Sequence, residues 1–211
     1  MPGVPVGVGS RVSLRYRIPD GMTDVVGHLE ALHPTVVVRT KSGEHVEVAP
    51  TEVVSVRELS HAPVRNSQIR DLERTAALAR PAAEQEWLAG WLLRADPYDP
   101  DRRANSAVPL DFLADLAALS QIVDWYARRR REPWLDLPER LLPVRATGSA
   151  PSRMLTCEGP AVDAEVAMSR TERGVAYVRV DEDDLPAIAR FAAMGFRLHH
   201  RSRFVLASDL V

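Results

Sequence analysis

The sequence predicts an α+β protein in which a small β-barrel precedes a mixed α/β domain. Two observations carry this prediction. Short β-rich runs separated by tight turns fill residues 8–58, whereas apolar spacings typical of helices first appear after residue 63. Near the C-terminus, a strand, a helix and a second strand follow one another between residues 174 and 206. We therefore divide the chain into residues 1–62 and 63–211.

The first segment is expected to contain five short strands. Val12, Leu14 and Tyr16 alternate with arginine and serine, which is the period of a half-buried strand. Residues 24–32 follow a Pro-Asp-Gly turn, and Gly27 indicates that this strand is bent or bulged there. Strands over 35–40, 45–48 and 51–56 complete a small SH3-like barrel that closes on itself.

The second segment begins with elements of both kinds. A helix capped by Asn66 or Ser67 is predicted to run to Pro81. Residues 86–95 and 104–110 are expected to form a strand hairpin. The longest helix is predicted to open at Pro109 and Asp111 and to end in the arginines at 128–131, with apolar positions repeating at helical spacing. A strand is predicted over 133–137.

The remaining chain contrasts an irregular stretch with a regular one. Residues 142–173 show no persistent period and predict mostly loop. A strand over 175–180 then leads to an N-cap at Asp183 or Asp184 and to a helix that ends at Gly195. A closing strand over 196–206 completes a β–α–β unit whose two strands need not be adjacent.

Composition excludes several classes of protein. Lysine and arginine number 27 against 29 acidic residues, and the isoelectric point near 6.3 gives no basic footprint for nucleic acid. No apolar run is long enough for a transmembrane helix, and the N-terminus lacks the features of a secretory signal. The single cysteine, Cys157, suits a reducing compartment. We expect a cytoplasmic protein without a membrane anchor.

Several segments resemble the GNAT superfamily of N-acetyltransferases. The run from Gly174 to Val180, Ala187, and the run from Met194 to His200 resemble the last third of such a domain. Residues 86–94 and 103–110, with the aromatic pairs at 125–126 and 133–134, resemble an actinobacterial branch called N-acetylglutamate-synthase-like. Its members join an SH3-like barrel to an acetyltransferase region. The resemblance implies an acetyl-CoA-dependent enzyme, with a shortened central region, that acts on a small-molecule or protein amine.

The resemblance also suggests how a cofactor would be held. GNAT proteins bind the pyrophosphate of acetyl-CoA on a loop of the form [Arg/Gln]-x-x-Gly-x-[Gly/Ala], whose backbone N–H groups face the anion before a helix. Arg145, Gly148 and Ala150 match this form, although so loosely specified a motif is more often an ordinary linker. The resemblance assigns Val178 and Val180 to the strand beside the cofactor.

Catalytic residues are not identified by the sequence. Asn105 and Ser106 are candidates for substrate contact, or else ordinary hydrogen-bonding groups of a strand end. His199 and His200 are expected on alternate faces of the last strand, so that one of them, His199, is a candidate base. Phe191 stands where GNAT enzymes usually carry a tyrosine that protonates the leaving thiolate, and a phenyl ring has no proton to donate.

Other polar and aromatic residues have ordinary structural interpretations beside functional ones. The acids could deprotonate an amine or could simply be solvated. The arginines could bind a phosphate or could be the solvated end of a helix, and the tryptophans could stack on nucleic-acid bases or could anchor the core. These residues are Glu84, Glu86, Asp124, Arg128 to Arg131, Trp87, Trp91, Trp125 and Trp134. Cys157 has no partner in the sequence that would activate it, and no set of ligands has zinc spacing.

Two functions of different classes therefore remain open. The first is a shortened N-acetyltransferase that transfers an acetyl group directly from acetyl-CoA to an amine. The second is a catalytically inactive relative that serves as a binding or scaffold protein through its barrel. One fold hosts many functions, so the site has to decide between them.

Overall fold

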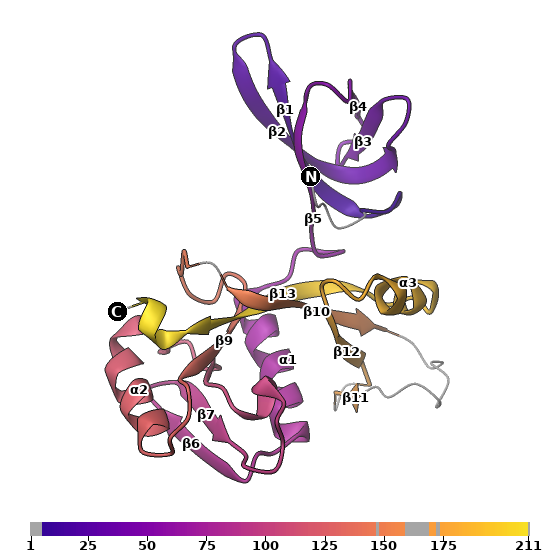
Figure 1. The fold of residues 1–211 in the computed structure, drawn as a ribbon. Helices are drawn as coiled ribbons and strands as arrows, with labels where there is room; N and C mark the ends of the chain where they lie inside the picture. The colour runs from indigo at the N-terminus through magenta and orange to yellow at the C-terminus, as the bar shows by residue number, and fades with distance from the viewer. Residues whose placement is uncertain (1–5, 147, 159–168, 172–173, 211) are drawn as a thin grey trace. The chain divides into compact units, whose positions relative to one another are not determined.

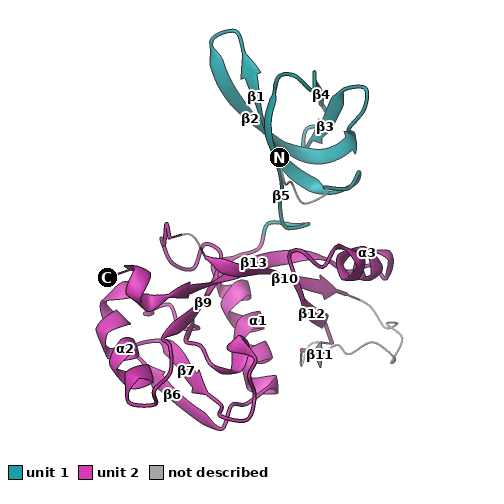
Figure 2. Ribbon diagram, in the orientation of Figure 1, with its two compact units in different colours: residues 1–63 teal, residues 64–211 magenta. Residues whose placement is uncertain are grey.

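The structure, a computed structural model, describes residues 6–146, 148–158, 169–171 and 174–210. The chain divides into two compact units, residues 1–63 and 64–211 (Figure 2). Both units are built mainly from antiparallel sheets, and the few helices belong to the second unit, so the α+β prediction is confirmed. No helix among the described residues has the length and apolar character needed to cross a membrane.

Unit 1 consists of five antiparallel strands, as predicted (Figure 1). They are β1 (Arg11–Ile18), β2 (Gly21–Ala31), β3 (Val36–Thr40), β4 (His45–Val48) and β5 (Val53–Glu58), paired in the order β4-β3-β2-β1-β5. Alternate residues point into a core that includes Val12, Leu14, Leu29 and Val38, each fully buried. This inward alternation is what the period of two in the sequence encodes.

Gly27 does not mark a bulge, contrary to the sequence prediction. It pairs in register with Val12 of β1 and Thr40 of β3, and the irregularity of the β2–β3 pairing falls instead between Leu29 and Ala31. A Cβ atom at position 27 would lie 2.2 Å from the carbonyl oxygen of Arg39. The glycine is therefore required because the neighbouring backbone approaches too closely for any side chain.

Unit 2 contains three helices and eight strands among its described residues. The helices are α1 (Asn66–Ala79), α2 (Leu119–Ala127) and α3 (Leu185–Ala193). The strands are β6 (Glu84–Leu88), β7 (Trp91–Ala95), β8 (Val108–Pro109), β9 (Trp134–Pro138), β10 (Ser149–Cys157), β11 (Ser169–Arg170), β12 (Ala176–Asp181) and β13 (Arg197–Leu206). Single 3₁₀ turns cover Arg102–Ala104, Leu116–Ala118 and Ala207–Leu210.

The predicted hairpin of residues 86–95 and 104–110 is correct only in part. Strands β7 and β8 pair, but residues 84–95 already fold as a hairpin of their own. Ala89 and Gly90 both adopt positive φ, which is the geometry of a two-residue turn between strands. Residues 102–104 form a 3₁₀ turn instead of a strand.

Helix α2 begins later than predicted. Residues 111–115 turn outside the helix, and the side chains of Phe112 and Leu113 are exposed. The carboxylate of Asp111 accepts a hydrogen bond from the Leu113 amide, and that of Asp115 accepts one from the Ala117 amide, both at 3.0 Å. Aspartates that bond the backbone two residues ahead favour turns over helix interiors, so the regular helix starts only at Leu119. The longest helix is α1 instead.

Strand β10 overturns the prediction of irregular structure for residues 149–157, whereas residues 142–146 are irregular as predicted. The stretch between Ala161 and Met168 lies outside the described residues. Strand β10 lies at the centre of a five-stranded sheet with the order β11-β12-β10-β13-β9. Met154 faces α1 beside Leu72, and Leu155 faces the opposite side of the sheet. Because both faces of β10 are covered, the strand lacks the apolar–polar alternation by which a half-buried strand is recognised. Proline, glycine and serine on either side hid its short apolar run.

The predicted β–α–β unit is confirmed, and β10 separates its two strands. The Asp184 carboxylate caps α3 by accepting a hydrogen bond from the Ala187 amide at 3.0 Å, and Gly195 ends the helix with φ of 90°. α3 packs its apolar side on Leu155, Val180 and Leu198. α1 covers the opposite face of the sheet (Figure 1), and a cavity lies on that face.

Candidate functional site

A cavity of about 390 Å³ lies in unit 2, lined by residues of α1, of strands β7 to β10 and β12, and of the turn after β7. This volume falls in the range of small-molecule sites. Its apolar lining comes from alanines of α1 together with Val108, Met154 and Val178. Polar side chains complete the wall: Glu73, Arg80, Arg94, Arg103, Asp136, Tyr177 and Arg179.

A buried ion network crosses this wall. Arg179 of β12 pairs with the carboxylate of Glu73 on α1 and, at 3.0 Å, with that of Asp136 on β9. Glu73 and Asp136 are 3% and 2% exposed. Carboxylates this deeply buried are retained only when cations and hydrogen bonds compensate the loss of water. The network therefore joins three elements that are far apart in sequence.

The network continues from Glu73 to a pair of histidines. The second oxygen of Glu73 lies 2.6 Å from Nε2 of His200, and Nδ1 of His200 lies 2.7 Å from Nδ1 of His199. His200 is buried and His199 is half-buried. The three side chains thus form a hydrogen-bonded chain from the cavity wall toward solvent.

A β-bulge brings the two imidazoles together. Met154 and Leu155 are consecutive in β10, but they pair with His200 and Leu198, so His199 is an extra residue in β13. Without the bulge, Leu198 and His200 would point to the same face, which is the α3 side. The prediction that the two histidines lie on alternate faces assumed a regular strand and is therefore wrong at this point.

The charges of the network shift several pKa values. Burial by itself raises the pKa of Glu73, but the charge of Arg179 and the hydrogen bond from His200 outweigh it and lower the pKa to about 2. Burial raises the pKa of Asp136, which shares Arg179 with Glu73. Burial and the neighbouring His200 lower the pKa of His199 to about 4. His199 is therefore neutral near pH 7.

We expect His199 to make folding stability depend on pH between about 6.5 and about 4. The unfolded histidine titrates near 6.5 and the folded one near 4, so the unfolded chain binds more protons in this window and the free energy of unfolding falls as pH falls. His199→Gln should remove up to about one proton from that slope. Urea unfolding followed by tryptophan fluorescence at several pH values measures it. An unchanged slope in the variant would contradict the shifted pKa.

Three buried polar atoms of the cavity wall lack hydrogen-bond partners among the described residues. They are Nε of Arg94, Nε of Arg103 and the hydroxyl of Tyr177. Arg94 and Tyr177 are each 5% exposed, whereas the other nitrogens of Arg103 pair with Asp101 and Asp181. The hydroxyl of Ser106, a candidate from the sequence, is also buried and has no partner among the described residues. Buried polar groups are normally satisfied, so these four atoms are unusual.

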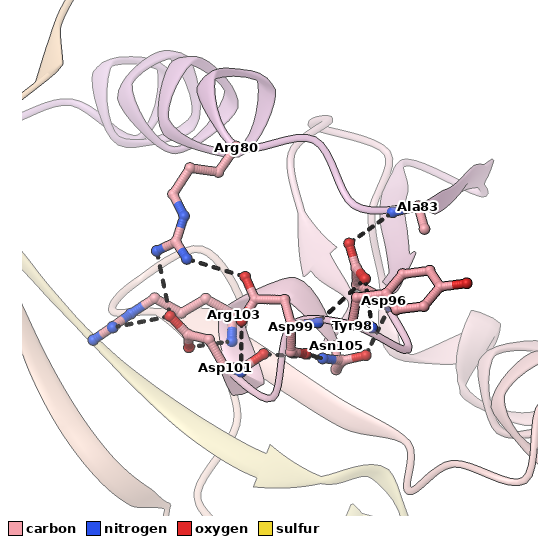
Figure 3. Close-up of polar contacts among 8 residues, drawn as sticks. All are labelled: Arg80, Ala83, Asp96, Tyr98, Asp99, Asp101, Arg103 and Asn105. Atoms are coloured by element: carbon pink, nitrogen blue, oxygen red, sulfur yellow. Dashed lines mark hydrogen bonds and ion pairs between the residues drawn. The ribbon is translucent and has the colours of Figure 1, made fainter.

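The carboxamide of Asn105 is bonded within a loop (Figure 3). Its Oδ1 accepts hydrogen bonds from the Asp96 amide at 2.8 Å and from Arg131 at 2.6 Å. Its Nδ2 donates to the carbonyls of Asp99 and Asp101 at 2.7 and 3.0 Å. Both ends of the carboxamide are occupied, and the residue follows a 3₁₀ turn and not a strand.

Asn105→Ala should lower the free energy of unfolding by about 2 kcal/mol, since it removes partners from several half-buried backbone groups. Urea unfolding followed by tryptophan fluorescence reports the change, because all four tryptophans belong to unit 2. Asn66→Ala is the matched control, because the side chain of Asn66 bonds Arg140 in an exposed position. Equal losses in both variants would disprove the organising role of Asn105.

The residues proposed for the cofactor loop lead into a strand. Gly148 precedes β10, Ala150 lies within it, and Arg145 is exposed, while Thr147 lies outside the described residues. A side chain at position 148 would meet that of Arg203. A GNAT pyrophosphate site combines backbone N–H groups of a loop with the N-terminus of the helix that follows it. Here a strand follows the motif, so the helix N-terminus is not present at this position.

The remaining positions from the GNAT resemblance lie in the core on the α3 side of the sheet. Val180 is buried there, and Val178 packs against the same cluster while also lining the cavity. Phe191 is 3% exposed and packs edge to face with Phe196 at 5.3 Å between ring centroids. Phe191 is thus a core residue of α3.

The other sequence candidates mostly have structural partners. Glu84 pairs with Arg129 at 2.7 Å, Glu86 accepts a hydrogen bond from Trp125 at 2.5 Å, and Arg131 bonds the Asp96 carbonyl. Asp124, Arg128 and Arg130 are exposed. Trp91 and Trp125 are core residues as expected, whereas Trp87 is half exposed and Trp134 stacks on Arg102. Cys157 lies 3.9 Å from the Met194 carbonyl. The described residues contain no group of three or more metal-ligating side chains.

The sequence analysis missed the buried network, although a signal was present. Glu73 interrupts the apolar side of α1, and Arg94, Asp136 and Arg179 each interrupt an otherwise apolar strand. A charged residue inside an apolar run is rarely buried without a partner. Four such interruptions in one domain predict that the charges meet.

Comparisons with known proteins match two separate parts of the chain. Two protein-family models match: one described as the C-terminal part of the probable histone acetyltransferase Rv0428c, over residues 66–172, and one described as the Rv0428c N-terminal Sm-like domain, over residues 6–57. Strands β12 and β13 lie beyond the first match.

A curated relative, the probable histone acetyltransferase Rv0428c of Mycobacterium tuberculosis, is 51% identical over 144 residues. The aligned region covers 66% of this chain and 47% of the relative, so the chain spans about half of that protein's length. The C-terminal family model covers half of this chain. The chain therefore belongs to the family of the probable histone acetyltransferase Rv0428c C-terminal domain.

Proposed function

We propose that this chain is an N-acetyltransferase of the GNAT type, which transfers the acetyl group of acetyl-CoA to an amine and uses His199 as the base. Membership of a family named for a probable histone acetyltransferase supports the acetyl transfer. The hydrogen-bonded chain of Glu73, His200 and His199 is the observation that carries the choice of base. The acceptor is the amine of a small molecule or a protein lysine.

The carboxylate of Glu73 fixes one side of the His200 ring. An ionised carboxylate only accepts hydrogen bonds, so Nε2 of His200 donates to Glu73. The proposed reactive form has His200 as the neutral Nε2–H tautomer, whose Nδ1 accepts a hydrogen bond from Nδ1–H of His199. This leaves the lone pair of His199 Nε2 free to accept a proton. Glu73 and His200 act as positioning residues, as the second and third members of other catalytic triads do.

The reaction then needs one proton acceptor and no covalent intermediate. The amine nitrogen attacks the thioester carbonyl, a C–N bond forms, and the C–S bond breaks. The proton lost by the amine passes to His199, and the departing thiolate takes a proton from water. Phe191 plays no part in this scheme because its ring has no proton to give.

The test measures release of free CoA and acetylation of the acceptor by mass spectrometry. The acceptors are a lysine-containing histone-tail peptide and a set of small amines. His199→Gln should lower kcat/KM by about 100-fold, since a positioned base contributes at least that much, and should leave the KM for acetyl-CoA unchanged. His45→Gln, in an exposed ion pair of unit 1, is the matched control.

Full activity of His199→Gln would disprove the role of this base. Failure of the wild-type chain to acetylate any acceptor or release CoA would overturn the transferase proposal. That result would favour an inactive relative that binds partners through unit 1. We propose that unit 1 is an SH3-like barrel, whereas the matching family model is described as Sm-like.

A further inference from the structure

Arg94 is a buried cation whose hydrogen-bonding capacity is unused. It lies on β7, is 5% exposed and lines the cavity. No described residue accepts a hydrogen bond from its side chain, and its Nε is fully shielded from solvent. A guanidinium offers five N–H donors, and burial without acceptors is costly, as the lowered pKa of Arg94 reflects. Some acceptor is therefore expected in the cavity.

Tyr177 supplies a second unused donor on the same wall. Its hydroxyl is buried and has no partner among the described residues, and the residue precedes Arg179 in β12. An unbonded phenol costs free energy in the ligand-free protein, because it has lost its water without gaining a partner. Arg94 and Tyr177 come from two different sheets, so the fold holds both in place on rigid elements.

The acceptors of the wall are already occupied. Glu73 is bonded by His200 and Arg179, and both oxygens of Asp136 lie within hydrogen-bond distance of Arg179. Arg80, also on the wall, pairs with Asp99 and Asp101 of the loop after β7. Arg103 pairs with Asp181. What the wall leaves open is therefore a set of donors. A cationic ligand would find no carboxylate that lacks a cation already.

We propose that this cavity binds the oxyanion of a small molecule, a carboxylate or a phosphate, through the guanidinium of Arg94 and the hydroxyl of Tyr177. A planar guanidinium fits either group with two parallel hydrogen bonds. The volume of about 390 Å³ restricts the ligand to a small molecule. Such a site needs only the donors of the cavity and does not depend on the proposed acetyl transfer.

Binding is tested on the whole chain with two probes, sodium acetate for carboxylates and inorganic phosphate. Thermal unfolding and calorimetric titration are compared with sodium chloride at equal ionic strength and with methylammonium chloride as a cation. We expect at least one oxyanion to raise Tm saturably, while chloride and methylammonium do not. Acetate alone identifies a carboxylate site, phosphate alone a phosphate site, and stabilisation by both supports their shared chemistry.

Three variants place the site. Arg94→Gln should weaken binding about tenfold or more, because it removes a charged donor. Tyr177→Phe should weaken binding several-fold while leaving the ligand-free protein equally or more stable, since the lost hydroxyl had no partner. Arg129→Gln, outside the cavity, is the matched control for the arginine and should leave binding unchanged.

Two results would overturn the proposal. One is the absence of any saturable stabilisation by acetate or phosphate. The other is unchanged binding in both Arg94→Gln and Tyr177→Phe, which would place the anion elsewhere. If Arg94→Gln does not fold, Tyr177→Phe and the NMR signal of the Arg94 Nε–H in the wild-type chain decide, since that signal must move with added probe. Acetyltransferase assays enter none of these readouts, so a failure here is distinguishable from a failure of the proposed function.

Discussion

Glu73→Gln should lower the free energy of unfolding of unit 2 by about 3 kcal/mol, which is more than we expect for Asn105→Ala. The substitution keeps the shape of the side chain and removes its charge. Arg179 then keeps only Asp136 as a carboxylate partner, and His200 loses the anion that holds its Nε2–H. Breaking a buried ion pair leaves an uncompensated charge away from water, which is why the loss is large.

Urea unfolding followed by tryptophan fluorescence measures this change, because all four tryptophans lie in unit 2. Glu84→Gln is the control, since Glu84 also pairs with an arginine but is more than half exposed. Exposed pairs contribute at most about 1 kcal/mol. If both variants lost the same small amount, the network would not be a buried, mutually dependent unit.

Gly27→Val should destabilise unit 1 by about 3 kcal/mol, because overpacking against backbone cannot be relieved by a rotamer change. The Cβ atom would lie 2.2 Å from the Arg39 carbonyl oxygen and 2.7 Å from a methyl group of Val38. Strand β3 would have to move away from β2, and its hydrogen bonds would be lost with it. Amide hydrogen exchange of β2 and β3 reports this opening directly.

Gly7→Ala is the matched control for the glycine, because nothing lies within 4 Å of its added Cβ and its φ is not in the left-handed region. We expect a change within about 0.5 kcal/mol there. Normal exchange protection of β2 in Gly27→Val would show that the neighbouring strand adjusts without cost.

Local patterns predicted most of the fold. The strands of unit 1, α1, β9 and the β–α–β unit follow from a period of two or of 3.6, which acts within a few residues of chain. The cap at Asp184 was also predicted, whereas α1 begins after Arg65 and contains Asn66 and Ser67 within it, so the cap predicted there is wrong. The start of α2 was misjudged because two aspartates bond the backbone ahead of them and compete with the helix. Strand β10 was missed because it is covered on both faces and so shows no alternation.

The candidate site was predictable only in fragments. His199 stood out by its chemistry, but its orientation depends on a bulge that is defined by pairing with β10. Asn105 was noticed, yet its role depends on a loop that closes around its carboxamide (Figure 3). The bulge arises where two strands pair, and the Asn105 contacts arise from the closed path of a loop and from Arg131, 26 residues away, so neither follows from hydrophobic periodicity.

The order of amino acids was sufficient to predict most of the elements and the α+β class, because hydrophobic periodicity and turn chemistry are local properties. Only the folded chain brings Glu73, Asp136, Arg179 and His200 into one buried network, and only it leaves Arg94 and Tyr177 as unused donors on a cavity. These relations join residues up to 127 positions apart. Their energies depend on burial and on mutual distance, which no local pattern contains.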